Sequence, residues 1–372
     1  MKIVYLSSSA IPSQTANSVQ VMKMCHGFAG IGHTVWLLTP WVIGNDRERL
    51  LCSRDIFKYY NVASNFRVSW MNVANIRGKP LYLIPKIIRQ LRSIKPDIVY
   101  GRFLLGCVAA ALAGWPSVYE AHCPVWEINP IERLAFTLLL QLPAFKRCIF
   151  ISEILRTIYV QRFPSHDGKF VVAHDAADVP QYSQTKRPST SIVTGYVGSL
   201  GEGKGVEIVV GLARKNPDIR FIIAGGTENQ KESLQKRVPP NIELVGFVSQ
   251  SDICEVYNRF EVALLPNQLY MPSYGSKINI ADYNSPLKLF EYMAHSKAMI
   301  SSDLPNIREI LSEETAILVK PSDILAWSKA LNELRNPDVR QRLKDAAFRQ
   351  LMYNHTWQKR AELVLNDLEW CR

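Results

Sequence analysis

The sequence predicts an α/β protein built from two doubly wound domains, each a parallel sheet covered by helices. Short apolar runs of the buried-strand type alternate with helical patterns in both halves of the 372-residue chain. A polar stretch at residues 181–190, whose only aromatic or aliphatic side chain besides a proline is one tyrosine, is interpreted as a linker. The expected domains are residues 1–182 and 183–355.

The first half opens with an apolar run that predicts a strand at residues 1–7. A helical pattern at residues 18–32 ends at a glycine, and a second strand is predicted at residues 33–40. Four further runs of buried-strand type lie at residues 96–102, 117–122, 147–152 and 169–175. Helical patterns separate these runs, so the strands are expected to lie parallel to one another.

The same pattern restarts after residue 190. Strands are predicted at residues 191–199, 218–226, 241–248, 260–266, 297–303 and 315–321. Helices are expected near residues 205–216, at residues 285–294 and in two stretches toward the C-terminus. No GxGxxG fingerprint follows the first strand, which disfavours a dinucleotide-dependent dehydrogenase.

The composition is that of a globular, basic protein, with 47% apolar residues and a net charge of +11. Residues 1–182 hold 20 Lys and Arg against 11 Asp and Glu, whereas residues 183–372 hold 24 against 22. Much of the excess lies at residues 77–95, where six basic side chains surround seven leucines and isoleucines. This segment fits two readings equally: an amphipathic helix on an anionic membrane, and a surface helix packed on the domain core.

Several protein classes are disfavoured. No apolar run reaches the roughly 20 residues that a membrane-spanning helix requires, and the N-terminus lacks the apolar region of a signal peptide. The seven cysteines are scattered without a CxxC pair, so we expect reduced thiols and no zinc site. No nucleic-acid-binding motif is present. The expected location is cytoplasmic. The membrane reading of the basic segment would add peripheral attachment to the inner face of the membrane, whereas the core-packing reading would not require it.

Two motifs in the second half suit a ligand that carries phosphate and sugar groups. SPLKLFEYMA predicts a helix in which Ser285 supplies a capping hydroxyl and Pro286 follows it. Glu291 lies one turn into this helix, where a carboxylate can accept hydrogen bonds from sugar hydroxyls. GSLGEGKG, at residues 198–205, lacks the Walker motif, in which the glycines are followed by Lys and then Ser or Thr. Such a glycine-rich loop can still wrap a diphosphate, with Lys204 offsetting its negative charge. Local chemistry alone leaves an ordinary capped helix and a solvated turn as alternatives.

Taken together and in order, these segments resemble the GT-B glycosyltransferases, and within them the retaining enzymes of glycosyltransferase family 4. The resemblance covers nearly the whole chain and is stronger in the second half. It rests there on YVGSLGEGKGVEIVV, NIELVGFVSQSDICEVYNRFEVALLP, SPLKLFEYMAHSKAMISSDLPNIREIL and HTWQKRAELVL, and in the first half on GHTVWLLTP, YEAH and the IFISE…HDAAD run. It implies two Rossmann-like domains facing a central cleft, with residues 356–372 as a helix that crosses back to the N-terminal domain.

The resemblance implies a nucleotide-sugar donor bound mainly to the C-terminal domain. Glu291 takes the place of the family glutamate that holds the ribose hydroxyls, and Lys204 that of the lysine facing the diphosphate. His122 matches the cleft histidine near the transferred bond, while Asn17 and Ser18 begin the helix that faces the cleft. The implied catalytic residues are thus His122, Lys204 and Glu291. The other implied donor-binding residues are Gly198, Ser199, Gly246, Phe247, Val248, Ser285, Pro286, Leu287 and Lys288.

The chain departs from the family pattern at two positions. The glutamate that is usual eight residues before Glu291 is replaced by Tyr283, beside Asp282, so the chain looks like the SPLKLFEYMA-type subgroup. The arginine often found in the glycine-rich loop is replaced by Ser199. Lys288 is therefore a candidate to neutralise the diphosphate together with Lys204. The donor sugar and its base, the acceptor, the oligomeric state and the residue that replaces the first glutamate are left open.

The reaction implied by the resemblance transfers a glycosyl group to a hydroxyl of a glycan or lipid-linked acceptor with anomeric retention, in cell-surface polysaccharide or glycoconjugate biosynthesis. No DxD motif is present, so neither a metal nor a cofactor is expected. No side chain is an obvious nucleophile, which fits a front-face mechanism. Two alternatives are a sugar-nucleotide epimerase of the same fold and a non-catalytic relative that binds a glycan or a partner enzyme.

Overall fold

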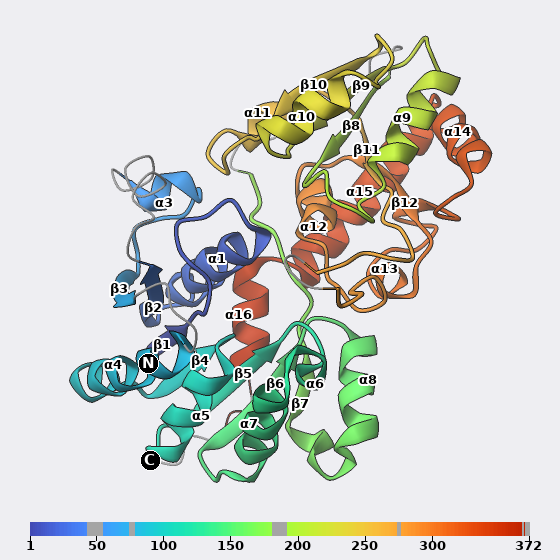
Figure 1. Ribbon diagram of the computed structural model, residues 1–372. Helices are drawn as coiled ribbons and strands as arrows, with labels where there is room; N and C mark the ends of the chain where they lie inside the picture. Colours follow the sequence, from blue (N-terminus) through green and yellow to red (C-terminus); the bar gives the residue numbers. More distant parts are fainter. Residues whose placement is uncertain (43–54, 74–78, 181–191, 274–276, 367, 369–372) are drawn as a thin grey trace. The chain divides into compact units, whose positions relative to one another are not determined.

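The computed structural model describes residues 1–42, 55–73, 79–180, 192–273, 277–366 and 368. The chain divides into two compact units (Figure 1). Unit 1 comprises Met1–His174 and Trp357–Arg372, and unit 2 comprises Asp175–Thr356. The linker expected at residues 181–190 lies outside the described residues.

Unit 1 contains a parallel sheet whose described strands follow the order β3-β2-β1-β4-β5-β6-β7. These strands are β1 (Lys2–Leu6), β2 (Thr34–Val42), β3 (Arg67–Val73), β4 (Ile98–Gly101), β5 (Ser117–Ala121), β6 (Phe145–Phe150) and β7 (Phe170–Val172). The helices are α1 (Ala16–Gly30), α3 (Ile56–Tyr59), α4 (Lys79–Ile94), α5 (Leu104–Leu112), α6 (Val125–Ile128), α7 (Pro130–Gln141), α8 (Glu153–Arg162), the 3-10 helix η1 (Pro164–Lys169) and α16 (Trp357–Leu365). The doubly wound parallel sheet predicted from the alternating pattern is confirmed.

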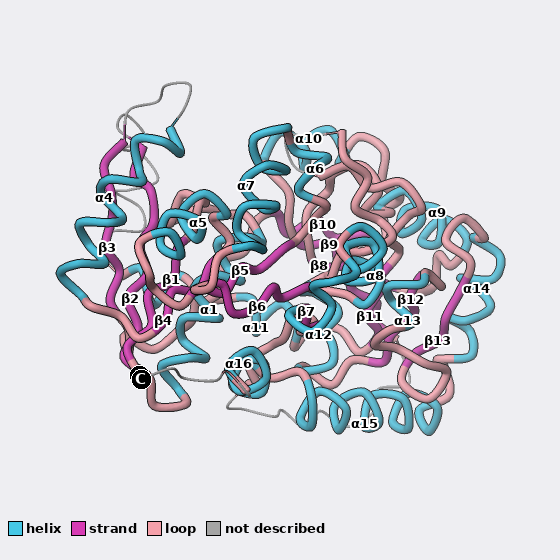
Figure 2. Tube along the Cα trace, turned by 90° about the horizontal axis from the view of Figure 1, so that it is seen from below, coloured by secondary structure: helices cyan, strands magenta, loops and turns pink. Residues whose placement is uncertain are grey.

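The helices α4, α5 and α7 lie side by side in unit 1. Helix α4 packs against β3 and α5, and α5 packs against α7 (Figure 2). The apolar face of α4 is buried in a core with β1 and β4, through Leu83, Ile87 and Leu91. Its opposite face exposes Lys86, Arg89 and Arg92. The described part of the basic segment therefore does pack on the core, and it also keeps a basic surface.

The C-terminal helix α16 belongs to unit 1 and packs against α1 (Figure 1). A Cβ atom at Gly27 of α1 would lie 2.7 Å from the carbonyl oxygen of Trp357, so the close approach of the two helices requires glycine there. Trp357 and Arg360 are 1% and 2% exposed. One face of helix α16 is thus buried in unit 1, while Gln358, Lys359 and Glu362 stay exposed on the other.

Unit 2 contains a second parallel sheet, whose described strands follow the order β10-β9-β8-β11-β12-β13. The strands are β8 (Val193–Val197), β9 (Arg220–Ala224), β10 (Ile242–Gly246), β11 (Val262–Leu265), β12 (Ala298–Ser302) and β13 (Ala316–Val319). The helices are α9 (Val206–Lys215), α10 (Glu228–Gln235), α11 (Ile253–Tyr257), α12 (Leu287–Ala294), α13 (Pro305–Arg308), α14 (Ile324–Glu333) and α15 (Pro337–Asn354). One core joins the sheet to α9 and α14, and the other joins it to α11, α12 and α15.

The start of α12 differs from the sequence prediction. Pro286 occupies the N-cap position, and no side chain caps the helix. The hydroxyl of Ser285 instead accepts a hydrogen bond from the backbone N–H of Asp175 at 2.9 Å. The prediction of Ser285 as the helix cap is therefore wrong, because a partner 110 residues away takes its hydroxyl. The first turn of α12 keeps backbone N–H groups that no side-chain cap satisfies.

None of the described helices in either unit combines the length and the apolar character needed to cross a bilayer.

Candidate functional site

The glycine loop, residues 198–205, joins β8 to α9 in unit 2. Gly198, Gly203 and Gly205 have positive φ angles of 148°, 76° and 76°, which favour glycine. A Cβ atom at Gly203 would lie 2.2 Å from the Tyr270 carbonyl oxygen, and one at Gly205 would lie 1.8 Å from that of Pro266. The backbone of this loop is therefore pressed against the segment that follows β11, and side chains are excluded from the contact.

Lys204 projects from the glycine loop toward sulfur rather than toward a carboxylate. Its Nζ atom lies 2.8 Å from the Sδ atom of Met271, whose side chain is fully buried. Burial lowers the pKa of Lys204 to about 8. Among the described residues, no carboxylate forms an ion pair with this lysine.

Lys288, at the start of α12, approaches the same loop. Its Nζ atom lies 3.2 Å from the Tyr196 hydroxyl and 4.3 Å from the centre of the Tyr196 ring, and Tyr196 also donates a hydrogen bond to the Ser199 carbonyl. Burial, and secondly the charge of Lys204, hold the pKa of Lys288 well below its ordinary value, against an opposing contribution from Glu291. Within the described part of the chain, Lys288 too has no carboxylate in ion-pair distance.

Glu291 lies one turn further along α12 and is held from α11. The Tyr257 hydroxyl donates a hydrogen bond of 2.7 Å to its Oε2 atom, and the Gln250 amide lies 3.5 Å from Oε1. The residue as a whole is partly exposed. Glu291 is therefore fixed in direction without being fully buried.

The remaining donor-side predictions lie around these groups or beside them in unit 2. Gly246 ends β10 with φ 84° and accepts a hydrogen bond from the Gly225 N–H, while Phe247 is 39% exposed and Val248 packs against the core. Leu287 is partly buried in the first turn of α12. Tyr283 is 5% exposed, so its side chain belongs to the interior, whereas Asp282 is exposed.

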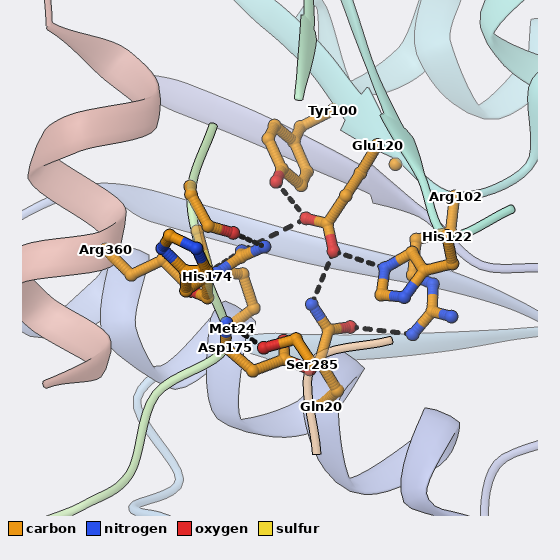
Figure 3. A network of polar contacts seen from close by, with 12 residues as sticks. Gln20, Met24, Tyr100, Arg102, Glu120, His122, His174, Asp175, Ser285 and Arg360 are labelled. Atoms are coloured by element: carbon orange, nitrogen blue, oxygen red, sulfur yellow. Dashed lines mark hydrogen bonds and ion pairs between the residues drawn. The ribbon is translucent and has the colours of Figure 1, made fainter. Parts of the chain in front are cut away.

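In unit 1 the predicted His122 follows β5 and contacts a buried carboxylate. Its Nε2 atom lies 2.6 Å from Oε1 of Glu120, and its side chain is 20% exposed. Figure 3 shows Gln20, Tyr100 and Arg360 also pointing at Glu120. Burial raises the pKa of the Glu120 carboxyl, but Arg360 and the His122 hydrogen bond outweigh it and hold that pKa well below the ordinary range.

Asn17 and Ser18 lie in the first turn of α1, after the N-cap Thr15. The Ser18 hydroxyl is buried, 2.9 Å from the carbonyl oxygens of both Ser13 and Thr15. It therefore stabilises the helix start. The Oδ1 atom of Asn17 is buried without a hydrogen-bond partner among the described residues. Their roles toward an acceptor stay predictions.

Sequence reasoning missed most of the Glu120 network. Gln20, Tyr100 and Arg360 come from α1, β4 and α16, and no local pattern connects them. The one signal was Glu120 itself, because a glutamate within a short apolar strand must find partners when it is buried. Among the described residues, no group of three or more His, Cys, Asp or Glu side chains is placed to hold a metal ion.

Residues 18–179 match the family described as Glycosyltransferase Family 4, and residues 191–336 match the family described as Glycosyl transferases group 1. The chain is a GT-B glycosyltransferase of the family 4 type. The alpha-monoglucosyldiacylglycerol synthase of Acholeplasma laidlawii is 22% identical over 308 residues, which cover 71% of this chain and 74% of the relative.

Solved structures agree on the fold of this glycosyltransferase. HepE of Anabaena in complex with UDP has a TM-score of 0.71 at 15% identity, with 98% of both chains covered. A glycosyltransferase of Rickettsia africae also has a TM-score of 0.71 at 15% identity, over 98% of this chain and 99% of that one. The predicted GT-B architecture of two Rossmann-like domains is thereby confirmed.

Proposed function

We propose that this glycosyltransferase moves a sugar from a nucleoside-diphosphate sugar to an acceptor hydroxyl with retention of the anomeric configuration. The observation that carries the proposal is the pair Lys204 and Lys288 beside the glycine loop, two amines without a carboxylate partner in the described chain. Two lysine amines next to a glycine-rich backbone suit a bound diphosphate, whose negative charge favours their ammonium form. The UDP complex of HepE makes UDP-sugars the first donors to test.

The other groups of unit 2 take roles that follow from their chemistry. The uncapped first turn of α12 presents backbone N–H groups to the leaving phosphate, as helix N-termini do. Glu291, oriented by Tyr257, accepts hydrogen bonds from the ribose hydroxyls. Lys204, Lys288 and the helix terminus together stabilise the charge that develops on the diphosphate, so we propose a reaction that needs no metal.

Binding of nucleotides to the purified protein tests this site. Calorimetric titration with UDP, GDP and ADP identifies the base. Glu291→Ala should weaken the binding of the preferred nucleotide and should affect the stability of the fold less. Each charge-assisted hydrogen bond lost costs about 1.5–3 kcal/mol. Glu333→Ala, at an exposed glutamate of α14, is the matched control for the loss of a negative charge. An unchanged affinity in Glu291→Ala would remove the glutamate from the site.

The stereochemical proposal has its own measurement. Proton NMR of the product formed with a UDP-sugar of known anomeric configuration shows whether that configuration is kept, and an inverted product would contradict the proposal. Interconversion of sugar nucleotides without an acceptor would instead indicate an epimerase. The absence of both transfer and interconversion, with nucleotide binding intact, would indicate a non-catalytic relative.

We further propose that unit 1 binds an anionic membrane and takes a lipid-linked acceptor there. Helix α4 exposes Lys86, Arg89 and Arg92. In the same layer of helices, α7 exposes an apolar stripe at helical spacing, with Ile131, Leu134 and Leu138 at 65%, 71% and 42%. A basic surface next to exposed apolar side chains suits an anionic bilayer, and the synthase of A. laidlawii is named for a glucosylated diacylglycerol.

Sedimentation with liposomes tests the membrane proposal. The protein should bind anionic vesicles at low salt, leave them at high salt and ignore neutral vesicles. Changing Lys86, Arg89 and Arg92 to Glu should abolish the binding, and Leu134→Ser should weaken it without changing the salt dependence. Equal binding to neutral vesicles, or full binding by the triple variant, would contradict the proposal.

A further inference from the structure

The carboxylate of Glu120 is a buried charged group of unit 1 with hydrogen-bond partners on both oxygens. Its side chain is fully buried in β5, a strand with every residue buried. Its Oε1 atom lies 2.6 Å from Nε2 of both His122 and Gln20, and its Oε2 atom accepts hydrogen bonds from Arg360, at 3.1 Å, and from the Tyr100 hydroxyl (Figure 3). A buried carboxylate with two partners on each oxygen has no freedom to rotate.

The guanidinium of Arg360 is equally fixed. Its Nε and Nη2 atoms donate to the carbonyl oxygens of His174 and Ala173 at 2.9 and 3.1 Å, while Nη1 reaches Glu120. The side chain is 1% exposed. The close contact of Gly27 with Trp357 sets the position of α16 and therefore that of Arg360. The C-terminal helix thus delivers one fixed positive charge to the Glu120 carboxylate.

This arrangement defines the state of the His122 ring. Because Nε2 faces a carboxylate at hydrogen-bond distance, it must carry the hydrogen, and in the neutral ring Nδ1 is then an acceptor. The charged groups that act on the ring are Glu120, Arg102 and Arg360; Arg102 is in turn held 3.0 Å from the Gln20 amide oxygen. Burial, with Arg102 and then Arg360 adding to it against Glu120, lowers the pKa of His122 to about 4.

We propose that Glu120 and Arg360 are positioning residues, which hold the His122 ring in one tautomer and orientation so that Nδ1 accepts a hydrogen bond from a sugar hydroxyl. The substrate part of this inference rests on the proposed glycosyl transfer; the tautomer does not. A protonated ring, or a neutral ring protonated at Nδ1, would present a donor where the proposed hydrogen bond needs an acceptor, and a flipped ring would present carbon there. The carboxylate fixes the ring, and the arginine fixes the carboxylate.

The tautomer is measured directly, without substrate. Long-range proton–nitrogen NMR of histidine-labelled protein, with His122→Gln to assign the signal, should show His122 neutral at pH 7, protonated at Nε2 and without titration down to pH 5. Glu120→Gln should shift the ring toward the form protonated at Nδ1, because the amide NH2 can face Nε2. A wild-type ring that is protonated at Nδ1, or that titrates near its ordinary pKa, would overturn the proposal even if no variant folds.

Kinetics separate positioning from a merely structural role. Glu120→Gln should lower kcat about 10–100-fold, as for other outer partners of functional histidines, with nucleotide affinity in unit 2 unchanged. Arg360→Lys, which keeps the charge, should retain the wild-type tautomer of His122 and most of kcat. Arg360→Gln, which removes the charge, should lose both. Arg340→Gln is the control, since this buried arginine of unit 2 bonds the Leu334 carbonyl and should leave the His122 signal unmoved.

The outcomes of the two proposals remain distinguishable. If folded Glu120→Gln keeps both the wild-type tautomer and the wild-type kcat, Glu120 is not a positioning residue. If the wild-type protein binds no nucleotide and transfers no sugar, the proposed function fails whatever the NMR signal shows. If the tautomer changes as expected while kcat stays at the wild-type level, the ring is positioned but Nδ1 does not contact the reacting sugar, which overturns the substrate part.

Discussion

The buried carboxylate described in unit 1 has a partner of opposite charge, whereas the two lysine amines of the candidate site in unit 2 have none among the described residues. In unit 1 the Glu120 carboxylate is matched by Arg360 and hydrogen-bonded at both oxygens. In unit 2 the amines of Lys204 and Lys288 approach a glycine loop, a thioether and a tyrosine instead of a carboxylate. A matched charge fixes the geometry around it, whereas an unmatched charge is available to a ligand of the opposite sign. The contrast separates a site that orients a side chain from a site that binds an anion.

The largest effect is expected from breaking the matched pair. Arg360→Met leaves Glu120 buried without its counter-charge, and we expect the free energy of unfolding to fall by about 3–5 kcal/mol. Chemical denaturation of the variant measures this loss. Adding Glu120→Gln should recover part of it, because the double variant no longer buries an uncompensated charge. A loss below about 1 kcal/mol in the single variant would mean that the pair is not essential to unit 1.

The removal of a positive charge from unit 2 should instead leave the stability almost unchanged and weaken nucleotide binding. Lys288→Met removes a half-buried amine that has no carboxylate partner among the described residues. The free energy of unfolding should therefore change by less than about 1 kcal/mol, although the contact of the amine with the Tyr196 ring is lost as well. Nucleotide affinity should fall by about 1.5–3 kcal/mol. Denaturation and calorimetric titration on one sample measure both quantities. A stable variant with wild-type affinity would show that Lys288 does not meet the diphosphate.

The architecture was predictable because each signal for it is local. Alternating apolar runs indicated the strands of both sheets, and the glycines at residues 198–205 indicated a loop that only glycine can form. Strand β3 was not predicted. It is an edge strand with mostly exposed or half-exposed residues, so it has no continuous apolar run.

The candidate site was only partly predictable, because most of its contacts join residues that lie far apart in sequence. Lys204 and Glu291 stand in motifs, and Lys288 was a candidate from its place beside them. The partners of Glu120 lie 100, 20 and 240 residues away in sequence, at Gln20, Tyr100 and Arg360. The hydroxyl of Ser285 was assigned to the wrong partner for the same reason. The local sequence indicates which polar group will be buried, whereas only the fold shows which residues become its hydrogen-bond or ion-pair partners.

A smaller effect on nucleotide affinity should appear when Lys204 is deprotonated by raising the pH instead of being replaced. The pKa of Lys204 in the free protein is about 8, and a bound diphosphate raises it, since an opposite charge favours the ammonium form. Nucleotide affinity should therefore be constant near pH 7 and fall as the pH rises through 8, by at most tenfold per pH unit. Lys204→Arg stays charged and should flatten the profile. An affinity that is flat up to pH 9.5 in the wild type would contradict the assignment.

The smallest expected effect is that of a chelator. If Lys204, Lys288 and the first turn of α12 neutralise the diphosphate, then a divalent cation has no necessary role in transfer, and initial rates with and without EDTA should agree. The comparison is sharpest in Lys288→Met, where a cation can take over the missing charge: added Mg²⁺ should raise the rate of this variant while leaving the wild-type rate unchanged. Complete loss of wild-type activity in EDTA, restored by Mg²⁺, would mean that the unmatched lysines of unit 2 do not supply the charge that the leaving group requires.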